Sequence, residues 1–262
     1  MSGTPPRPLH PVSVALRLVI GASWGLFCLL PTLAIATLLL PWRGLRVRLG
    51  NLYARVAALP FVRIMGFDWH IDHPERLGGQ QAIYLCNHTS SLDLFLGSGL
   101  CPMGGCGTAK KEIIYIPAIG QAFWLTGHLR LDRGNTDKAK ASMRELAEVV
   151  GRHALSVWVW PEGTRAKDGR LQPFKKGFVH MAVATGLPIV PVVLVGAHKH
   201  WPAKGFRLVP GTIEVKVLPP ISTVGWTVEG ADAHIAELQA VYTRELPADQ
   251  RPLLGPTVPP LE

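Results

Sequence analysis

The segment "NHTSSLD", residues 87–93, contains two residue types that together can move a proton. His88 follows the apolar run "AIYLC", and Asp93 comes five residues later. A neutral imidazole can accept a proton from a hydroxyl group. A carboxylate bonded to the other ring nitrogen fixes the tautomer that leaves the acceptor nitrogen free. We therefore interpret His88 as a general base and Asp93 as the group that orients it. The alternative is that Asp93 only caps a helix.

The spacing of this pair constrains the local structure. Five residues correspond to about 500° of rotation around an ideal α-helix, so the two side chains cannot share one helix face. They can meet only if His88 precedes a helix and Asp93 lies in its first turn. The intervening "TSS" offers the residue types that begin helices, and an acid suits the positive end of the helix dipole. The sequence therefore predicts a helix that begins between the two residues.

A second polar cluster, "WPEGTR" at 160–165, follows the apolar run "SVWV". It contains Glu162, Gly163 and Arg165. Glycine lets the backbone approach a ligand closely. The arginine guanidinium is permanently charged and can hold two phosphate oxygens at once. This turn is therefore a candidate phosphate site, unless Glu162 and Arg165 simply form a surface ion pair.

Short β-like runs alternate with helical stretches from residue 80 onward, and Gly and Pro separate them. The expected strands are 82–86, 128–132, 156–160, 189–195 and 212–218. The expected helices are 136–153, with Gly151 as a stop signal, and 175–186. Such alternation predicts an α/β domain, residues 67–262, with a mixed and largely parallel sheet flanked by helices. Polar residues just after the strands would then meet at one edge of the sheet.

Residues 1–66 differ from the rest and are interpreted as membrane-anchoring and interfacial helices. The stretch from Leu18 to Trp42 contains no charged residue. As one helix it would be about 37 Å long, enough to cross a bilayer. Pro31 lies near its middle and equally permits a helical hairpin within one leaflet, which we favour. A cleaved signal peptide is a third interpretation.

Charge and apolar spacing also indicate a membrane partner. The chain has 27 Lys and Arg against 18 Asp and Glu, and no acid precedes Asp68. Basic residues that flank an apolar segment favour anionic lipid over nucleic acid. Five residues recur at helical spacing after Trp42, and they could face lipid or pack on the protein's own core. They are Leu45, Leu49, Leu52, Val56 and Leu59, with Arg46, Arg48 and Arg55 on the other flank.

Four clusters, "NHTSSLD", "TGHLRLDR", "WPEGTR" and "IVPVV", together resemble the sequence blocks of the glycerolipid acyltransferases. The resemblance covers about residues 80–220. It implies a catalytic site with His88, Asp93 and Glu162. It further implies substrate binding by Lys110, Arg133, Gly163, Thr164 and Arg165, with Arg133 and Arg165 on phosphate, Lys110 as a further basic position and Thr164 shaping the turn. Arg130 stands where the family usually has an apolar or aromatic residue, and we expect it to face solvent.

The resemblance implies transfer of a fatty acyl group from a thioester to the free hydroxyl of a lysophospholipid, with lysophosphatidate as the expected acceptor and phosphatidate as product. The donor would be acyl-CoA or acyl carrier protein. No metal or bound cofactor is expected, since the thioester is already activated.

The four cysteines lack metal-site spacing and are interpreted as reduced thiols. We expect a protein at the cytoplasmic face of a membrane. An acceptor other than lysophosphatidate, or a non-catalytic protein that binds anionic lipid, are the alternatives.

Overall fold

The computed structural model describes residues 7–115, 119–131 and 136–253. Its α-helices are α1 (Pro11–Leu38), α2 (Arg43–Ile64), α3 (Leu92–Leu100), α4 (Ile119–Leu125), α5 (Thr136–His153), α6 (Gly177–Thr185), α7 (Ala197–His200) and α8 (Ala231–Glu245). Its strands are β1 (Phe67–Asp72), β2 (Ile83–Cys86), β3 (Gly105–Lys110), β4 (Leu129–Leu131), β5 (Ser156–Val159), β6 (Ile189–Val195) and β7 (Gly211–Val217).

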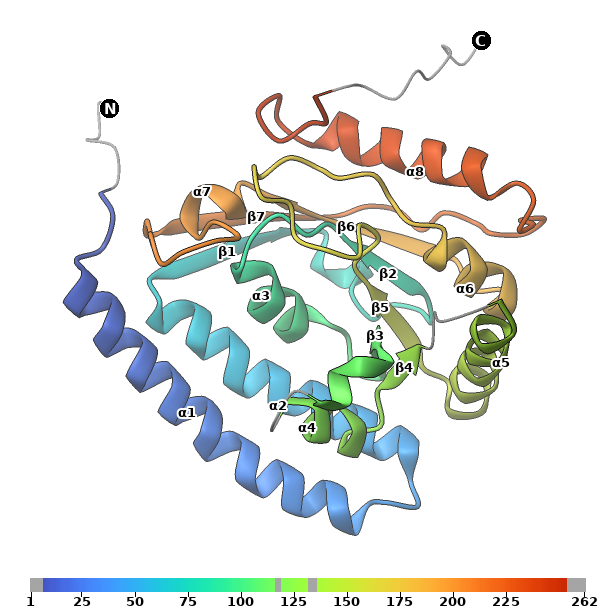
Figure 1. The fold of residues 1–262 in the computed structure, drawn as a ribbon, viewed down its shortest axis with the longest axis horizontal. Coiled ribbons are helices and arrows are strands. Elements are labelled where there is room, and N and C mark those ends of the chain that lie inside the picture. The colour runs from blue at the N-terminus through green and yellow to red at the C-terminus, as the bar shows by residue number, and fades with distance from the viewer. Residues whose placement is uncertain (1–6, 116–118, 132–135, 254–262) are drawn as a thin grey trace.

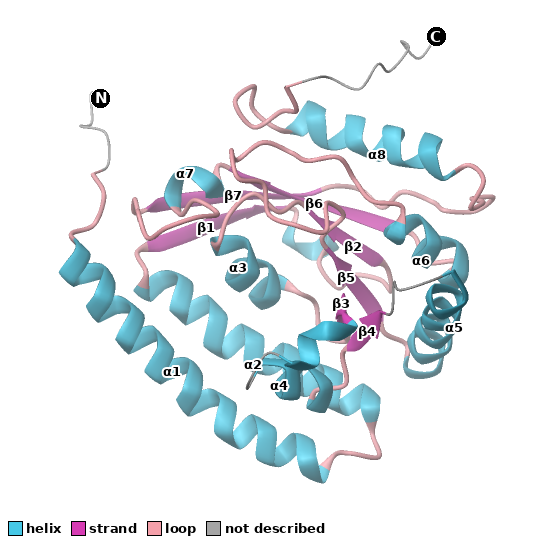
Figure 2. Ribbon diagram, viewed as in Figure 1, coloured by secondary structure: helices cyan, strands magenta, loops and turns pink. Residues whose placement is uncertain are grey.

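The strands form one sheet in the order β1-β7-β6-β2-β5-β3-β4 (Figure 1). Every neighbouring pair is parallel except β6 and β7, which are antiparallel. Figure 2 shows α1 to α4 on one side of the sheet and α5, α6 and α8 on the other. The predicted mixed, largely parallel sheet flanked by helices is confirmed.

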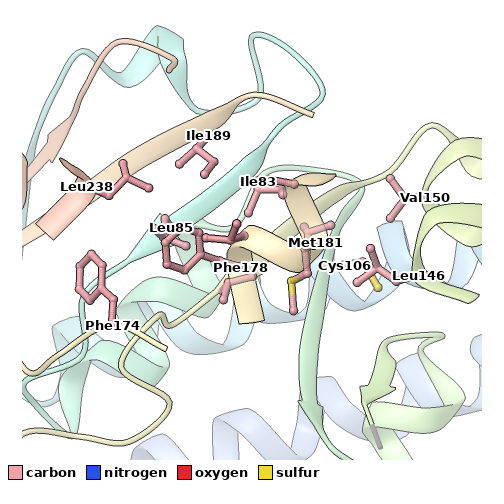
Figure 3. Close-up of a cluster of buried hydrophobic side chains, with 14 of the residues drawn as sticks. Ile83, Leu85, Cys106, Leu146, Val150, Phe174, Phe178, Met181, Ile189 and Leu238 are labelled. Carbon is pink, nitrogen blue, oxygen red and sulfur yellow. The ribbon is translucent and has the colours of Figure 1, made fainter. Parts of the chain in front are cut away.

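The central strand β2 shows how the sheet is buried on both faces. Ile83 and Leu85 point into a core shared with α5, α6 and α8, which Figure 3 shows in close-up. Tyr84 and Cys86 point into a second core on the side of α2 and α3. All four side chains are fully buried, which explains why this strand has an uninterrupted apolar sequence rather than an alternating one.

The expected hairpin with its turn at Pro31 is wrong. The helix α1 continues through Pro31, and the chain reverses at residues 39–42 instead, where α2 begins its return (Figure 1). An internal proline removes one backbone hydrogen bond. Buried side chains of α1 lie on both sides of it, Val14 and Ala36 among them, so packing against the rest of the protein holds both halves in one helix.

The helix α2 packs a different face on the protein than the apolar stripe suggested. Its buried residues include Val47, Asn51 and Val62, whereas Leu45 and Leu52 are about half exposed. Glycine and asparagine do not register as core residues in an apolar pattern, yet both line the buried face here. Part of the predicted apolar face of α2 is therefore exposed and can contact lipid.

Two arginines of α2 bond the protein's own backbone. Arg46 donates to the carbonyl of Leu125 at the end of α4, with 2.8 Å between Nη1 and the oxygen. Arg43 donates to the carbonyl of Gly127 at 3.0 Å. These two guanidinium groups connect α2 to the end of α4 and the residues after it, so part of the basic charge of α2 stabilises the fold.

Candidate active site

The register of two neighbouring strands brings the two polar clusters together. In the parallel pair β2 and β5, Leu85 lies opposite Val159. His88 and Glu162 each come three residues after those partners, beyond the carboxyl ends of their strands. Parallel strands end at the same edge of the sheet, which is where α/β folds place their sites. Segments 74 residues apart therefore meet at this edge.

The geometry around His88 confirms the predicted helix start and the pairing with Asp93. Asp93 is the second residue of α3 and is fully buried. Its Oδ2 atom lies 3.1 Å from His88 Nδ1 and accepts the backbone N–H groups of Thr89 at 2.6 Å and Ser90 at 2.7 Å. One carboxylate oxygen thus holds both the ring and the turn that carries it. Among the described residues, His88 Nε2 has no hydrogen-bond partner, which leaves it available to a substrate.

Glu162 holds the same loop from the other side. Its Oε1 accepts the backbone N–H of His88 at 3.0 Å, and the side chain is 1% exposed. Its Oε2 has no hydrogen-bond partner among the described residues. Burial disfavours the charged form and raises the pKa of Glu162 to about 8, against an ordinary value of 4.5. The protonated carboxyl is therefore favoured at neutral pH.

Arg165 is exposed and lies next to the same loop. Its Nη1 donates to Ser91 Oγ at 2.9 Å, two residues before Asp93. The turn that presents it needs a glycine, because Gly163 has φ 70°, a conformation that strains other residues. No ion pair joins Arg165 to Glu162, so the alternative of a surface Glu–Arg pair is wrong. The guanidinium is positioned by a hydroxyl group and keeps donors free for an anion.

An open groove of about 420 Å³ begins at Arg165. Most of its wall is apolar and comes from α1, α2, α3 and the loop after α7. The lining residues are Leu18, Phe61, Ser91, Leu94, Phe95, Arg165, Trp201, Ala203, Gly205 and Phe206. Three of the aromatic rings form a cluster, with Phe95 lying 4.3 Å from Phe61 and 5.9 Å from Trp201 between ring centroids. The groove therefore combines an apolar wall with one cationic residue, Arg165, whose neighbour Ala166 bonds the His88 carbonyl.

Comparisons with known proteins identify the family of this chain. An acyltransferase family model matches residues 69–195, which include both polar clusters. A 1-acyl-sn-glycerol-3-phosphate acyltransferase of Limnanthes douglasii is 44% identical over 92% of this chain and 83% of its own. The Cocos nucifera protein of that name is 43% identical over 84% of this chain and 71% of its own. The chain belongs to the acyltransferase family. Its fold matches the crystal structure of a 1-acyl-sn-glycerophosphate acyltransferase, PlsC, from Thermotoga maritima, with a TM-score of 0.61, 22% identity, and coverage of 86% of this chain and 97% of that one.

In this acyltransferase three predicted substrate residues remain to be placed, namely Thr164, Lys110 and Arg133. Thr164 is exposed on the turn between Gly163 and Arg165. Lys110 is the last residue of β3, where it lies opposite Leu131 at the same sheet edge. The preceding glycines are held in the strand because β5 pairs with them. Arg133 lies outside the described residues. Arg130 is exposed, as expected.

Sequence reasoning missed residues that position the acyltransferase site without carrying its chemistry. Asn87, beside His88, exchanges two hydrogen bonds with the backbone of Leu194 in β6. Ser91 orients Arg165. Gln250 is fully buried near the same loop although it lies in the proline-rich tail. The Asn-His pair was a signal for the first of these. Nothing in the local sequence singles out the last.

Proposed function

We propose that this acyltransferase is a 1-acyl-sn-glycerol-3-phosphate acyltransferase, which moves a fatty acyl group from an acyl thioester to the free hydroxyl of lysophosphatidate and forms phosphatidate. One observation carries the proposal. The residue after Arg165, Ala166, donates its backbone N–H to the His88 carbonyl at 3.0 Å, so the buried His88–Asp93 pair lies close to an arginine that lines the apolar groove. This combination suits an acceptor with a hydroxyl, a phosphate and a fatty tail. The names of its plant relatives favour the same acceptor.

The reaction assigns a proton path to His88. Nε2 accepts the proton of the acceptor hydroxyl as its oxygen attacks the thioester carbonyl carbon, so that a C–O bond forms. Asp93 stabilises the imidazolium through Nδ1. The tetrahedral intermediate then collapses, the C–S bond breaks, and the imidazolium returns its proton to the leaving thiolate. The products are the ester and a free thiol, and His88 ends in its initial state.

Binding of the acceptor phosphate falls to Arg165, with Arg133 as a second ligand and Lys110 as a further cation at the same edge. A phosphate at Arg165 would take up the donors of the guanidinium that Ser91 does not use. Gly163 and Thr164 present this arginine, and the open backbone at Gly163 lets the glycerol approach the turn. The fatty tail would lie along the groove toward Phe61 and Leu18 of α2 and α1.

The donor is an acyl thioester of coenzyme A or of acyl carrier protein. Either carries the same activated carbonyl, and no bound cofactor takes part in the proposed steps. Among the described lysines near the site, Lys176 is paired with Asp232 at 2.9 Å, whereas Lys175 has no acidic partner. Lys175 is therefore the better candidate for a phosphate group of the donor.

Membrane association accompanies this function. The helix α1 is long and apolar enough to cross a membrane, and only 11% of its most apolar stretch is buried in the protein. Figure 1 shows it on the outside of α2, beside the elements that line the groove. An acceptor in the bilayer could enter from this side. We place the catalytic domain on the cytoplasmic face, where acyl thioesters are made.

The test is an assay of the purified full chain with a panel of lysophospholipids and with both donors. We expect phosphatidate from lysophosphatidate and slow reaction with acceptors that lack the terminal phosphate. Preference for another lyso-lipid would overturn the acceptor assignment while keeping the chemistry. Thiol release that no acceptor accelerates would indicate a thioesterase. Binding of anionic vesicles without any turnover would favour the non-catalytic alternative.

A further inference from the structure

The segment after α8, residues 247–251, reaches the back of the His88 loop. It lies outside residues 69–195, the part that matches the acyltransferase family. Within this segment Gln250 is 0% exposed, which is unusual for a glutamine in irregular structure. A buried amide is stable only when it is hydrogen-bonded, so the partners of Gln250 show why it is buried.

The side-chain amide of Gln250 bonds two segments of the site edge. Its Oε1 accepts the backbone N–H of Gly196 at 2.9 Å. Its Nε2 donates to the carbonyl of Leu194 at 2.9 Å, and Thr89 Oγ1 lies 3.4 Å from the same nitrogen. Gln250 thereby connects the end of β6 to the loop that carries His88.

The contacts converge on the two neighbours of His88. Asn87 Oδ1 accepts from the Leu194 backbone N–H at 2.7 Å, and Asn87 Nδ2 donates to the Leu194 carbonyl at 3.0 Å. That carbonyl therefore receives both the Asn87 and the Gln250 amides. On the other side of His88, Thr89 is fully buried and donates its backbone N–H to Asp93. Gln250 thus contacts Thr89 directly and is connected to Asn87 through the Leu194 carbonyl that both amides share.

The backbone of residues 248–251 is held by residues of two other segments, Lys199 in α7 and residues 170–171. Asp249 pairs with Lys199 of α7 at 2.6 Å. Arg170 Nη1 donates to the carbonyls of Ala248 at 3.3 Å and Arg251 at 3.0 Å. The carbonyl of Gln250 accepts the N–H of Leu171 at 2.9 Å, nine residues after Glu162. These bonds fix the backbone at Gln250, so its side chain enters the protein in one orientation.

We propose that Gln250 is a positioning residue for acyl transfer, which holds Asn87 and Thr89 so that His88 keeps its orientation toward the acceptor hydroxyl. It touches neither substrate nor reacting atoms. The proposal rests on the proposed function only in that His88 is the base. Loss of the amide should lower kcat with little change in either KM, because the groove and Arg165 lie elsewhere. The pH profile of kcat should also change, because Thr89 shares the Asp93 oxygen that bonds the imidazole.

The experiment compares Gln250→Met with a matched control, Gln81→Met, in the full chain. Gln81 makes the same kind of contact, donating to the carbonyl of Leu155 at 2.7 Å, but at the amino end of β2 and away from the site. We expect Gln250→Met to lower kcat about tenfold or more, since small misplacement of a catalytic group has effects of this size. Gln81→Met should lose comparable thermal stability and keep its kcat and pH profile.

A second pair of variants probes the link to the loop. Thr89→Val removes the hydroxyl that Gln250 meets and keeps the shape of the side chain, and Thr89→Ser restores the hydroxyl. We expect kcat to fall in the first variant and to recover in the second. If Gln250→Met does not fold, these variants decide the matter. Wild-type kcat and pH profile in Thr89→Val, or equal losses of kcat in Gln250→Met and Gln81→Met, would overturn the proposal.

The kinetics are measured with whichever acceptor the wild-type protein uses, or as thiol release if it uses none. A wild-type protein inactive toward lysophosphatidate therefore counts against the proposed function alone. A Gln250→Met protein with unchanged turnover counts against the positioning role alone.

Discussion

At the scale of single residues, the His88–Asp93 pair gives the first prediction. Because Asp93 Oδ2 receives three N–H groups, the imidazole N–H among them, we expect His88→Ala and Asp93→Asn each to lower kcat by about 10² to 10⁴. Both proteins should remain folded and membrane-bound. Steady-state transfer and circular dichroism make the measurement. The exposed His70 on β1 is the control, and His70→Ala should be fully active. Near-normal turnover in His88→Ala would refute the mechanism.

Arg165 gives a second prediction. We expect Arg165→Ala to raise the KM of a phosphate-bearing acceptor about tenfold or more and to leave the donor KM nearly unchanged, since a charge-assisted hydrogen bond contributes about 1.5–3 kcal/mol. Arg165→Lys should recover only part of the loss, because an ammonium group cannot bind two oxygens in one plane. The exposed Arg130 on β4 is the matched control. A change confined to the donor KM would assign Arg165 to the donor instead.

Glu162 gives a prediction about stability and pH. The folded protein keeps this carboxyl protonated up to about pH 8, whereas the unfolded chain loses the proton near its ordinary pKa of 4.5. Between these pH values the folded state binds more protons, so this group's contribution to the free energy of unfolding falls as the pH rises. Asp93 is a nearby charge that raises this pKa further. Glu162→Gln removes the titration, and we expect its Tm advantage over the wild type to grow from pH 5 to pH 8.

The same substitution distinguishes two possible roles of Glu162, which are to hold the His88 backbone N–H and to act on the substrate as an acid. A glutamine oxygen can still accept the His88 N–H that Oε1 accepts now, so Glu162→Gln should keep most of its activity. Glu162→Ala leaves that N–H buried without a partner and should lose much of the activity. If Glu162→Gln were as inactive as Glu162→Ala, the carboxyl would have to act on the substrate as an acid.

At the scale of elements, the predicted helices and strands that succeeded share a strong periodic pattern. The strand β6 was predicted with its observed bounds, because it is an unbroken apolar run. The helix α5 was predicted from its clear apolar face, but it continues past the expected stop at Gly151 to His153. By contrast, β3 contains glycines, and β1 alternates charged and aromatic residues at a sheet edge. Both are strands because a neighbouring strand pairs with them, β5 for the first and β7 for the second. The pairing strands lie far away in the sequence, so a local pattern does not reveal them.

The site shows the same division between local and distant causes. The spacing of His88 and Asp93 predicted their contact, because it depends only on where one helix begins. The approach of Glu162 to the His88 backbone depends on the register of β2 and β5, which no local pattern reveals. The role of Gln250 depends on the path of residues 247–251 beside β6, and the surrounding sequence, rich in proline, has no periodic pattern. The residues that carry the reaction were thus easier to predict than the residues that hold them in place.

Packing of α1 on α2 gives a prediction at this scale. A side chain at Gly21 would collide with the ring of Phe61 in α2, whereas nothing lies within 4 Å of such a side chain at Gly25. We expect Gly21→Val to destabilise the protein by about 1–3 kcal/mol through overpacking and to raise the acceptor KM, since Phe61 lines the groove. Gly25→Val makes the same change of residue in the same helix and should have little effect. Equal Tm values for the two variants would contradict the packing.

At the scale of the whole molecule, apolar surface and attachment determine how the protein can meet a bilayer. The exposed apolar side chains of α1 include Leu16, Val19, Phe27 and Leu30. The other face of α1 is bound to α2 at several points along its length. Trp24 Nε1 donates to the carbonyl of Val56 at 2.8 Å, for example. The helix α2 in turn packs on α3, so α1 is connected through α2 to the α/β domain.

This attachment favours insertion into one leaflet, although by a continuous helix rather than by a hairpin that turns at Pro31. A helix that crosses the bilayer would have to leave α2, losing contacts such as the Arg17 bond to the Ile64 carbonyl, or carry the arginines of α2 into the hydrocarbon. We therefore expect α1 to lie in the plane of one leaflet, with its apolar face in the acyl region and the groove at the surface. The chain end before α1 would then lie on the same side as the catalytic domain.

A single cysteine placed at Ser2, with the four native cysteines replaced, distinguishes the two topologies in sealed and oriented membranes. We expect a membrane-impermeant maleimide to label it from the side that holds the catalytic domain. A cysteine at Lys204, exposed in the loop after α7, reports the side of the domain in a matched protein. Labelling of the two positions from opposite sides would establish α1 as a transmembrane helix and would require it to separate from α2. Labelling from one side would leave the groove beside Leu18 open to lipid from the leaflet in which α1 rests.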